Sequence, residues 1–338
     1  MPAPRPRLAA CATRPALRRW HPRLPALILV LVVALALAGV PPAGAAPIPK
    51  TILVDPTSPC FICDGTTWPL AFHSLQDALD VAVAGDEIWV AKGTYKPSTP
   101  SGRSATFQLV PGVAIYGGFP PGGGAMEHRN FHTYASILSG NLGTPGRSYH
   151  VVPAVSAGST TILDGFTISD GLADSATSPN DRGAGVYVDG GHPTLRNRRI
   201  TGNTASTGGG MYDDGAGPTL TSVTFTDNTS TQAGGMYNGN GSHPSLLDVT
   251  FTGNQGGVAG GGMVNSSGSN PTLTQVSFKL NLADVGGGMY NNGSDPVLDH
   301  TEFISNTAGT GLGGGMANFD STPALTEVTF RGNSAESL

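Results

Sequence analysis

The feature that most constrains the fold is a repeat that fills the second half of the chain. Six asparagines recur at intervals of 25, 26, 27, 25 and 27 residues: Asn203, Asn228, Asn254, Asn281, Asn306 and Asn333. Six prolines keep the same intervals, each ten residues before its asparagine: Pro193, Pro218, Pro244, Pro271, Pro296 and Pro323. Only the segment between an asparagine and the next proline varies in length. A repeated core of constant length joined by connections of variable length is typical of stacked repeats.

Each copy also places apolar residues at strand spacing. A glycine-rich segment comes first, for example 208–212, and we predict that it is a strand. After the proline, leucine follows at two residues, valine at five and phenylalanine at seven. Valine and phenylalanine therefore share one face of a strand, and the chain must bend or bulge between leucine and valine. We expect the phenylalanines to form an interior ladder, and the asparagines to stack their amides along the axis.

A copy of this length is too short to bury its own apolar face, so the copies must stack with their strands in parallel. A propeller blade needs about 40 residues and four strands. A leucine-rich repeat needs an LxxLxL pattern, which the copies lack. We therefore predict an all-β chain that folds as a right-handed parallel β-helix. Residues 161–171 have the same apolar spacing and are predicted to be an earlier coil.

The chain before the repeats has a different pattern. Ser74 precedes a helical pattern over 75–84, which Gly85 ends, and Asp77 lies in its first turn. One amphipathic helix before a long β array predicts an N-terminal capping helix. Strands are expected at 51–55, 87–91, 106–110, 113–116, 137–141 and 149–152. The predicted organisation is an export signal at 1–45, a cap with the first coils at 46–150, and β-helix repeats at 151–338.

The N-terminus predicts export. Residues 1–45 carry six arginines and no acid, followed by an apolar run over 24–40 and the small residues Ala43 and Ala45. This arrangement is typical of a secretory signal cleaved after Ala45, with an uncleaved signal anchor as the alternative. The remaining chain has 12 basic residues (18 minus 6) and 23 acidic ones, a net charge of −11. An acidic chain argues against nucleic acid or an anionic membrane as the main partner.

Two cysteines stand in the exported part, Cys60 and Cys63, with CxxC spacing. In an exported protein this pair predicts a local disulfide. Redox catalysis is the weaker interpretation because no βαβ pattern surrounds the pair. A zinc site would need two further ligands.

Two stretches resemble known families. The segment SLQDAL with Gly85–Tyr95 resembles the N-terminal cap and first turn of pectin-lyase-like β-helix proteins. The pairing of GGG-Met with Phe-x-x-Asn over residues 183–338 resembles the repeat of polymorphic outer-membrane proteins. The second resemblance implies the exposed part of a surface adhesin.

The outward columns of the repeat offer little chemistry, because Thr, Ser and amides dominate them. One denser spot is Asp299, His300 and Glu302, with Glu327 nearby. A solvated strand face is the simpler interpretation, since neither a nucleophile nor an oxyanion feature accompanies these residues.

The basic residues of the exported part cluster once, at Arg196, Arg198 and Arg199. Arg198 occupies the inward valine column, where an unpaired charge is costly, and we expect Asp174 and Asp181 of the 173–182 excursion to pair with it. The alternatives are a local irregularity and a site for an anion or a carbohydrate acid.

Asp213, Asp214 and Asn238 are candidate calcium ligands, and Asn and Asp are also ordinary turn residues. We otherwise predict no cofactor.

Together these patterns predict an exported, non-catalytic β-helix of the cell surface or outer membrane, with an adhesive or structural role. The expected partner is a glycan or a surface-protein ligand. No capping element follows Asn333, so we expect either end-to-end self-association through the last coil or a natural chain that continues beyond Leu338. The alternative function is a polysaccharide lyase or hydrolase on the same fold.

Overall fold

Three parallel sheets wrap around one core in the computed structural model, which describes residues 48–98, 100–144 and 146–336. The described chain from Ile48 onward belongs to one unit. The predicted export signal at 1–45 lies outside the described residues. No helix in these ranges is long and apolar enough to span a membrane.

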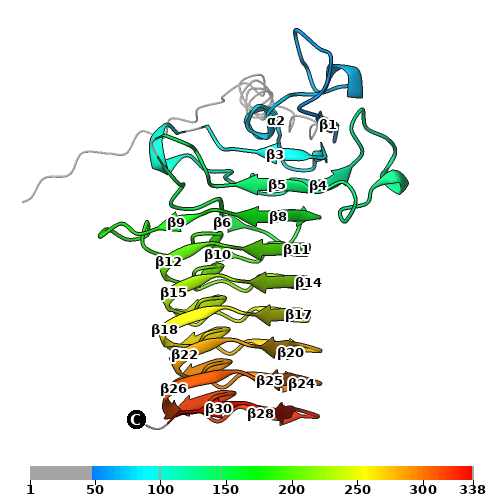
Figure 1. Cartoon of the computed structure of the whole chain (residues 1–338). Coiled ribbons are helices and arrows are strands. Elements are labelled where there is room, and N and C mark those ends of the chain that lie inside the picture. The colour runs from blue at the N-terminus through cyan, green and yellow to red at the C-terminus, as the bar shows by residue number, and fades with distance from the viewer. Residues whose placement is uncertain (1–47, 99, 145, 337–338) are drawn as a thin grey trace, which may run out of the picture. The chain divides into compact units, whose positions relative to one another are not determined.

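The longest sheet runs the whole length of the stack, through both the first coils and the repeats (Figure 1). Its main path in spatial order is β1 (Thr51–Val54), β2 (Glu87–Ala91), β4 (Ala114–Phe119), β7 (Ile162–Asp164), β11 (Thr194–Thr201), β14 (Thr219–Thr226), β17 (Ser245–Thr252), β20 (Thr272–Thr274), β24 (Val297–Asp299) and β28 (Ala324–Thr326). Beside this path lie β3 (Gly93–Tyr95), β5 (Ser136–Ser139), β8 (Phe166–Ser169), β21 (Ser277–Lys279), β25 (Glu302–Ile304) and β29 (Thr329–Arg331).

Two further sheets of seven strands complete each coil. The second sheet contains β6 (Val152–Ala157), β10 (Val186–Gly191), β13 (Met211–Asp214), β16 (Met236–Gly239), β19 (Met263–Ser266), β23 (Met289–Asn292) and β27 (Met316–Phe319). The third contains β9 (Leu172–Ala173), β12 (Thr204–Thr207), β15 (Thr229–Gln232), β18 (Gln255–Ala259), β22 (Leu282–Val285), β26 (Thr307–Leu312) and β30 (Ser334–Ala335). The chain is therefore a right-handed parallel β-helix, as the repeat predicts.

The register between coils follows the sequence repeat residue by residue. Phe225 of β14 pairs with Phe251 of β17, and Val223 pairs with Val249. The phenylalanine rings stack at centroid distances of 4.7–4.8 Å from Phe225 to Phe330. The first four rings of this ladder are fully buried, and Phe330 in the last described coil is 48% exposed. The predicted interior ladder is confirmed.

The asparagine column forms the predicted amide ladder. The Nδ2 of Asn228 donates to the Oδ1 of Asn254 at 3.0 Å, and Asn254 donates to Asn281 at the same distance. Each amide also donates to a main-chain oxygen of the preceding coil, as Asn254 does to Phe225. The column is buried from Asn203 to Asn306, so these bonds satisfy groups that water cannot reach.

The predicted bulge lies four residues after each proline, where the chain enters the left-handed region. The φ angles there are 49–56° at Asn197, Ser222, Asp248, Gln275, His300 and Glu327. A positive φ at a non-glycine residue is uncommon, and here it turns the strand between the leucine and valine positions.

The glycine runs end before the strands that they were expected to form. Strand β13 begins at Met211, and Gly208 has a φ of 64°. A Cβ on Gly210 would lie 2.6 Å from the oxygen of Gly235 and 2.8 Å from the Phe225 ring. The run is thus a tight corner packed against both ladders rather than a strand.

The N-terminal elements agree in part with expectation. Helix α2 (Leu75–Val81) begins after Ser74, whose Oγ accepts a hydrogen bond from the Gln76 amide at 3.0 Å. The helix ends before the predicted 84, because the chain turns where Val83 donates to Asp86. Its buried side chains belong to the same apolar cluster as Ile52 and Ile88. The short 3-10 helices are η1 (Trp68–Leu70), η2 (Gly102–Ser104) and η3 (Met126–His128).

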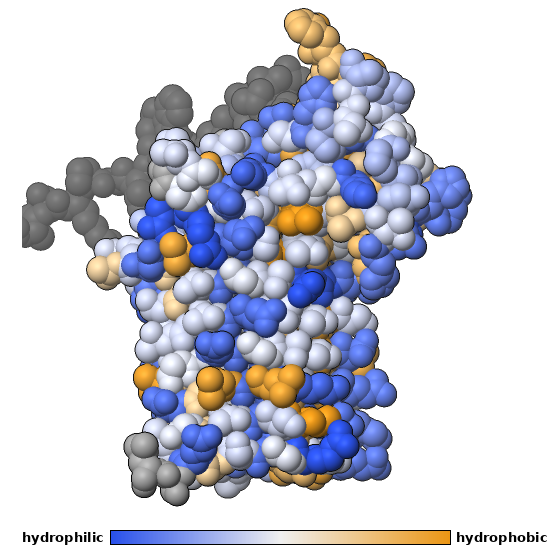
Figure 2. Space-filling view, in the orientation of Figure 1, coloured by the Kyte–Doolittle hydropathy of each residue, from blue (hydrophilic) through white to orange (hydrophobic). Residues whose placement is uncertain are grey.

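The strand predicted at 106–110 is wrong. Phe107 and Leu109 donate to the main-chain oxygens of Val151 and Pro153, but the segment forms no regular strand. The predicted strand at 149–152 begins only at Val152 and continues to Ala157. The face shown in Figure 2 is mostly hydrophilic or neutral, with apolar side chains scattered over it, as polar outward columns require.

Candidate functional site

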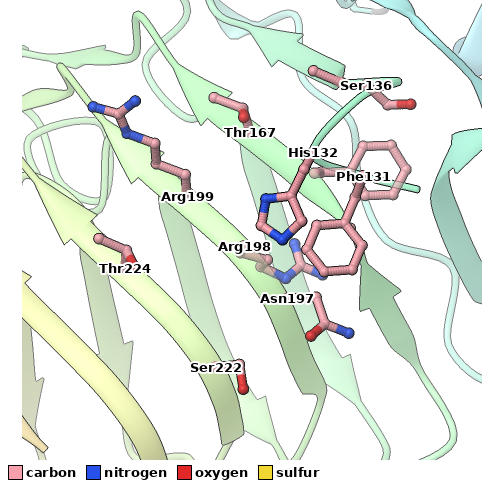
Figure 3. A pocket seen from close by; sticks show the side chains of 12 residues that line it. Phe131, His132, Ser136, Thr167, Asn197, Arg198, Arg199, Ser222 and Thr224 are labelled. Atoms are coloured by element: carbon pink, nitrogen blue, oxygen red, sulfur yellow. The ribbon is translucent and has the colours of Figure 1, made fainter.

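A cavity of about 600 Å³ lies on the outer face of the long sheet, at β8, β11 and β14. Three of its lining residues come from residues 129–135 of the connection between β4 and β5, and we call this segment the roof. The lining residues are Phe131, His132, Ala135, Ser136, Gly165, Phe166, Thr167, Asn197, Arg198, Arg199, Ser222 and Thr224. Figure 3 shows the rings of Phe131 and His132 extending over the strand that carries Asn197 and Arg198.

The repeat itself builds the floor of this cavity. Arg199 pairs in register with Thr167 of β8 and Thr224 of β14, so the three residues form one outward row. Asn197 and Ser222 stand in the left-handed column beside that row. The floor therefore presents a guanidinium among hydroxyl and amide groups.

The roof is held in place by Arg129. Its Nη2 lies 2.5 Å from the Oδ1 of Asp164 at the end of β7, and its Nε donates to the main-chain oxygen of Gly117. The Asn130 amide donates to Gly118 at 2.7 Å, and Ser136 Oγ accepts from the Gly118 amide at 3.0 Å. These contacts fix the connection against β4, the strand that precedes it, and against Asp164 of β7, which is 35 residues from Arg129 in the sequence.

Asp164 is the centre of an ion-pair cluster. It is 2% exposed, and besides Arg129 it accepts hydrogen bonds from Arg196 Nε at 2.7 Å and Asn197 Nδ2 at 2.9 Å. Burial alone would raise the pKa of Asp164, but the hydrogen bonds from Arg129 and Asn197 and the charge of Arg129 outweigh burial and lower it. Asp164 is therefore an ionised structural anchor.

Arg198 lies in the inward column, as its spacing predicts. It pairs in register with Val223 and is 4% exposed. Burial lowers the pKa of its guanidinium well below the ordinary value. Nonetheless arginine keeps its proton in proteins, so the group remains a buried cation. Within the described residues, its Nε, Nη1 and Nη2 have no hydrogen-bond partner.

The expected pairing of Arg198 with the 173–182 excursion is wrong. Asp174 instead pairs with Arg103 at 2.5 Å, and Asp181 pairs with the neighbouring Arg182 at 3.4 Å. Arg182 is itself part of the excursion, which projects from the end of β9 rather than folding over β11 (Figure 1).

The second predicted group forms a surface cluster on the same sheet. His300 Nδ1 lies 2.8 Å from Asp299 Oδ1, and its Nε2 lies 2.7 Å from Glu327 Oε2. The hydrogen bond and charge of Asp299, with the charge of Glu327, raise the pKa of His300. Glu302 borders the same shallow depression of about 310 Å³. All four side chains are open to solvent. The cluster is therefore a solvated strand face on which Asp299 and Glu327 hold the imidazole of His300 in place.

The three calcium candidates divide between two sides of their strands. Asp213 and Asn238 are in register and fully buried. Asp214 faces the other way and accepts hydrogen bonds from Tyr187 and Asn240. Burial raises the pKa of Asp213 to about 8. Successive strand residues point to opposite faces, so these three do not converge on one point.

Cys60 and Cys63 are joined by a disulfide in the loop after β1, with their Cα atoms 5.5 Å apart. The sequence prediction did not include His73, whose Nε2 lies 3.8 Å from Cys60 Sγ.

Sequence reasoning did not identify the roof. The contact between Arg129 and Asp164 occurs once and does not recur at the interval of the repeat. The only sequence feature that points to it is one arginine in a loop before the first repeat.

No family model matches this chain, and no curated protein does. Two solved structures resemble it in fold. The pectin methylesterase from Aspergillus niger in deglycosylated form is 11% identical, with 86% of this chain and 87% of that chain covered and a TM-score of 0.47. A pectate lyase is also 11% identical, with 84% and 79% covered and a TM-score of 0.44. At this identity the likeness concerns the fold alone.

Proposed function

We propose that this protein is an exported β-helix of the cell surface that binds an acidic glycan in the roofed cavity. Its role is adhesive or structural rather than catalytic. The observation that carries the proposal is the charge of the cavity. Four arginines gather in and beside it, while the chain as a whole carries a net charge of −5.

The charges in this cluster favour an anionic ligand. Arg129 and Arg196 share the single carboxylate of Asp164, whereas Arg198 is a buried cation and Arg199 is exposed on the floor. A carboxylate bound above the floor would offset part of the cost of burying Arg198. It would also find in Arg199 the planar fork that arginine offers to carboxylates.

The rest of the lining favours a sugar over a compact ion. Hydroxyl groups from Thr167, Ser222 and Thr224 and the amide of Asn197 offer both donors and acceptors. Phe131 supplies an aromatic ring at the edge. The volume lies within the range of ordinary small-ligand sites, which is about 300–1,000 Å³.

Eliminative cleavage of the same class of glycan is a second candidate, and one observation favours it. His132 and Arg199 line the same cavity, and such an elimination needs a base together with a cation that stabilises the developing negative charge. Hydrolysis by a carboxylate pair has no such support, because the described lining residues contain no Asp or Glu.

Calorimetric titration with an oligogalacturonate tests the proposal, and a neutral maltooligosaccharide of equal length serves as the comparison ligand. We expect binding of the acidic oligomer only. Arg199→Ala should weaken binding by about 10- to 100-fold, as expected for loss of one charged hydrogen bond. Arg331→Ala, which removes an exposed arginine of β29 on the same sheet, should leave the affinity unchanged. Equal affinity for both oligomers would contradict the proposal.

The same samples distinguish binding from cleavage. Release of an unsaturated product, followed by its ultraviolet absorbance and abolished in His132→Ala, would establish the lyase instead. The surface location rests on the N-terminal pattern and the outer-membrane repeat resemblance. Antibody labelling of intact cells tests it, and signal appearing only after cell lysis would contradict it.

A further inference from the structure

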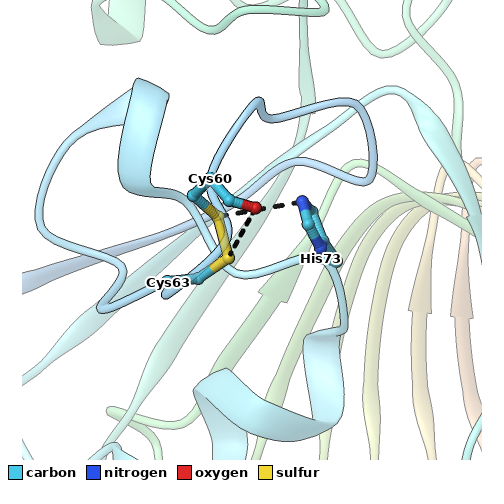
Figure 4. A group of neighbouring side chains, drawn as sticks. All are labelled: Cys60, Cys63 and His73. Atoms are coloured by element: carbon cyan, nitrogen blue, oxygen red, sulfur yellow. Dashed lines mark hydrogen bonds between the residues drawn. A yellow bond between two sulfur atoms is a disulfide. The ribbon is translucent and has the colours of Figure 1, made fainter.

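The loop after β1 brings together three metal-ligating side chains away from the cavity. The Sγ atoms of Cys60 and Cys63 and a ring nitrogen of His73 all lie within 4.8 Å of one another (Figure 4). The cysteines are partly exposed and His73 is exposed. The disulfide joins the two sulfurs, so the group can take a metal only after reduction.

The loop is anchored by bonds that do not involve the disulfide. Main-chain hydrogen bonds of 2.8–2.9 Å tie Leu53 to Gly65 and Phe72, and Asp55 to Phe72. Ser58 Oγ lies 3.0 Å from Cys60 Sγ and 3.0 Å from the oxygen of Ala71. These bonds keep His73 opposite the cysteines. The three donors should therefore stay close together when the sulfurs separate.

The loop is also open to reductants. Phe61 and Ile62, between the cysteines, are 100% and 81% exposed. Exposed disulfides are the ones most easily reduced. A small dithiol can reduce this pair with two electrons and two protons, becoming a disulfide itself and leaving two thiols on the protein.

We propose that the reduced loop binds one copper(I) ion through Cys60, Cys63 and His73. Thiol–disulfide exchange with a small disulfide, which takes up the two electrons together with two protons from solvent and becomes a dithiol, restores the Cys60–Cys63 bond and releases the ion. Soft thiolates select copper(I), and the group provides three protein ligands. A structural zinc site would require four. Binding displaces one proton from each thiol, and the imidazole binds in its neutral form.

His73 must change one contact to act as a ligand. Its Nε2 lies 2.9 Å from the main-chain oxygen of Ser58, where it donates a hydrogen bond. Coordination needs the lone pair of this nitrogen, so the proton moves to Nδ1 and the bond to Ser58 is exchanged for the metal. Loss of one exposed hydrogen bond is a small cost compared with formation of a metal–ligand bond.

The test uses the full chain with Cys11→Ser, so that the third cysteine cannot contribute a thiol. The protein is reduced with dithiothreitol, desalted without oxygen and titrated with copper(I) against a coloured copper(I) chelator. We expect one ion per reduced chain and none per oxidised chain. X-ray absorption should show two sulfur ligands and one nitrogen ligand.

Variants separate a three-ligand site from simple thiol binding. Cys60→Ser should abolish binding, and His73→Gln should weaken it by at least about tenfold. His128→Gln, at another exposed histidine, is the matched control and should bind as the parent does. Circular dichroism confirms that each variant is folded. Equal binding by reduced and oxidised chains, no effect of His73→Gln, or tighter binding of zinc(II) than of copper(I) would overturn the proposal.

Discussion

Replacing Asp213 by asparagine should change how the stability of the β-helix depends on pH. Asp213 occupies the first position of a second buried ladder. In this ladder Asn238 donates to Asn265, Asn265 to Asn291 and Asn291 to Asn318, each at 2.7 Å. The Oδ1 of Asn238 and both carboxyl oxygens of Asp213 have no hydrogen-bond partner within the described residues. A protonated Asp213 can supply the missing donor to Asn238.

The size of the effect follows from the pKa. Burial raises the pKa of Asp213 to about 8, from an ordinary value of 3.8. Between these values the folded chain keeps a proton that the unfolded chain releases. The stabilisation that Asp213 contributes is therefore fully present below about pH 4. It is lost as the pH rises toward about 8, by at most about 1.4 kcal/mol per pH unit. Above that range the charged carboxylate is buried without a partner, at a cost of several kcal/mol.

Asp213→Asn removes this dependence, because an amide donates to Asn238 at every pH. Urea denaturation of both proteins from about pH 4 to about pH 9 measures how the free energy of unfolding depends on pH. The variant should equal the wild type at low pH and exceed it by about 2–5 kcal/mol near pH 8. Asp214→Asn, on the opposite face of the same strand, is the control and should keep the slope of the wild type. Parallel curves for wild type and Asp213→Asn would refute the reasoning.

Three further predictions follow from the fold and the site. Phe251→Ala removes a fully buried ring from the middle of the stack and should cost about 3–5 kcal/mol of unfolding free energy; a loss below about 1 kcal/mol in urea denaturation would contradict the interior ladder. Arg129→Met leaves Asp164 with one arginine fewer and should accelerate hydrogen exchange in the roof, whereas unchanged exchange would show that this ion pair does not hold it. His300 should titrate above its ordinary pKa by NMR, and Glu327→Gln should lower that value; an unshifted resonance would contradict the contact.

The repeat predicted most of the β-helix because each interior contact recurs at a fixed interval. The phenylalanine and asparagine ladders and the bulge all follow from distances measured from each proline. The second ladder was missed, although it was readable, since Asp213, Asn238, Asn265, Asn291 and Asn318 each stand two residues after a methionine. The third sheet was missed as well. Its strands, such as β12 (Thr204–Thr207), lie in the variable segment and carry little apolar pattern.

The candidate site was predictable only in part. The cluster of Arg196, Arg198 and Arg199 stood out in the sequence, and the inward position of Arg198 followed from the valine column. Its assumed partners were wrong, because the conformation of a non-repeating excursion cannot be derived from a periodic pattern. The roof depends on Arg129 reaching Asp164, and His73 reaches the cysteines in the same way. Both contacts are single long-range ones without a repeated spacing.

The central claim is that the roofed cavity holds an acidic sugar. A crystal structure of the chain with a bound oligogalacturonate tests it most directly. The account predicts a uronate carboxylate within hydrogen-bond distance of Arg199, with a sugar ring beside Phe131 and His132. A sugar bound elsewhere on the β-helix, with this cavity containing only water, would contradict it.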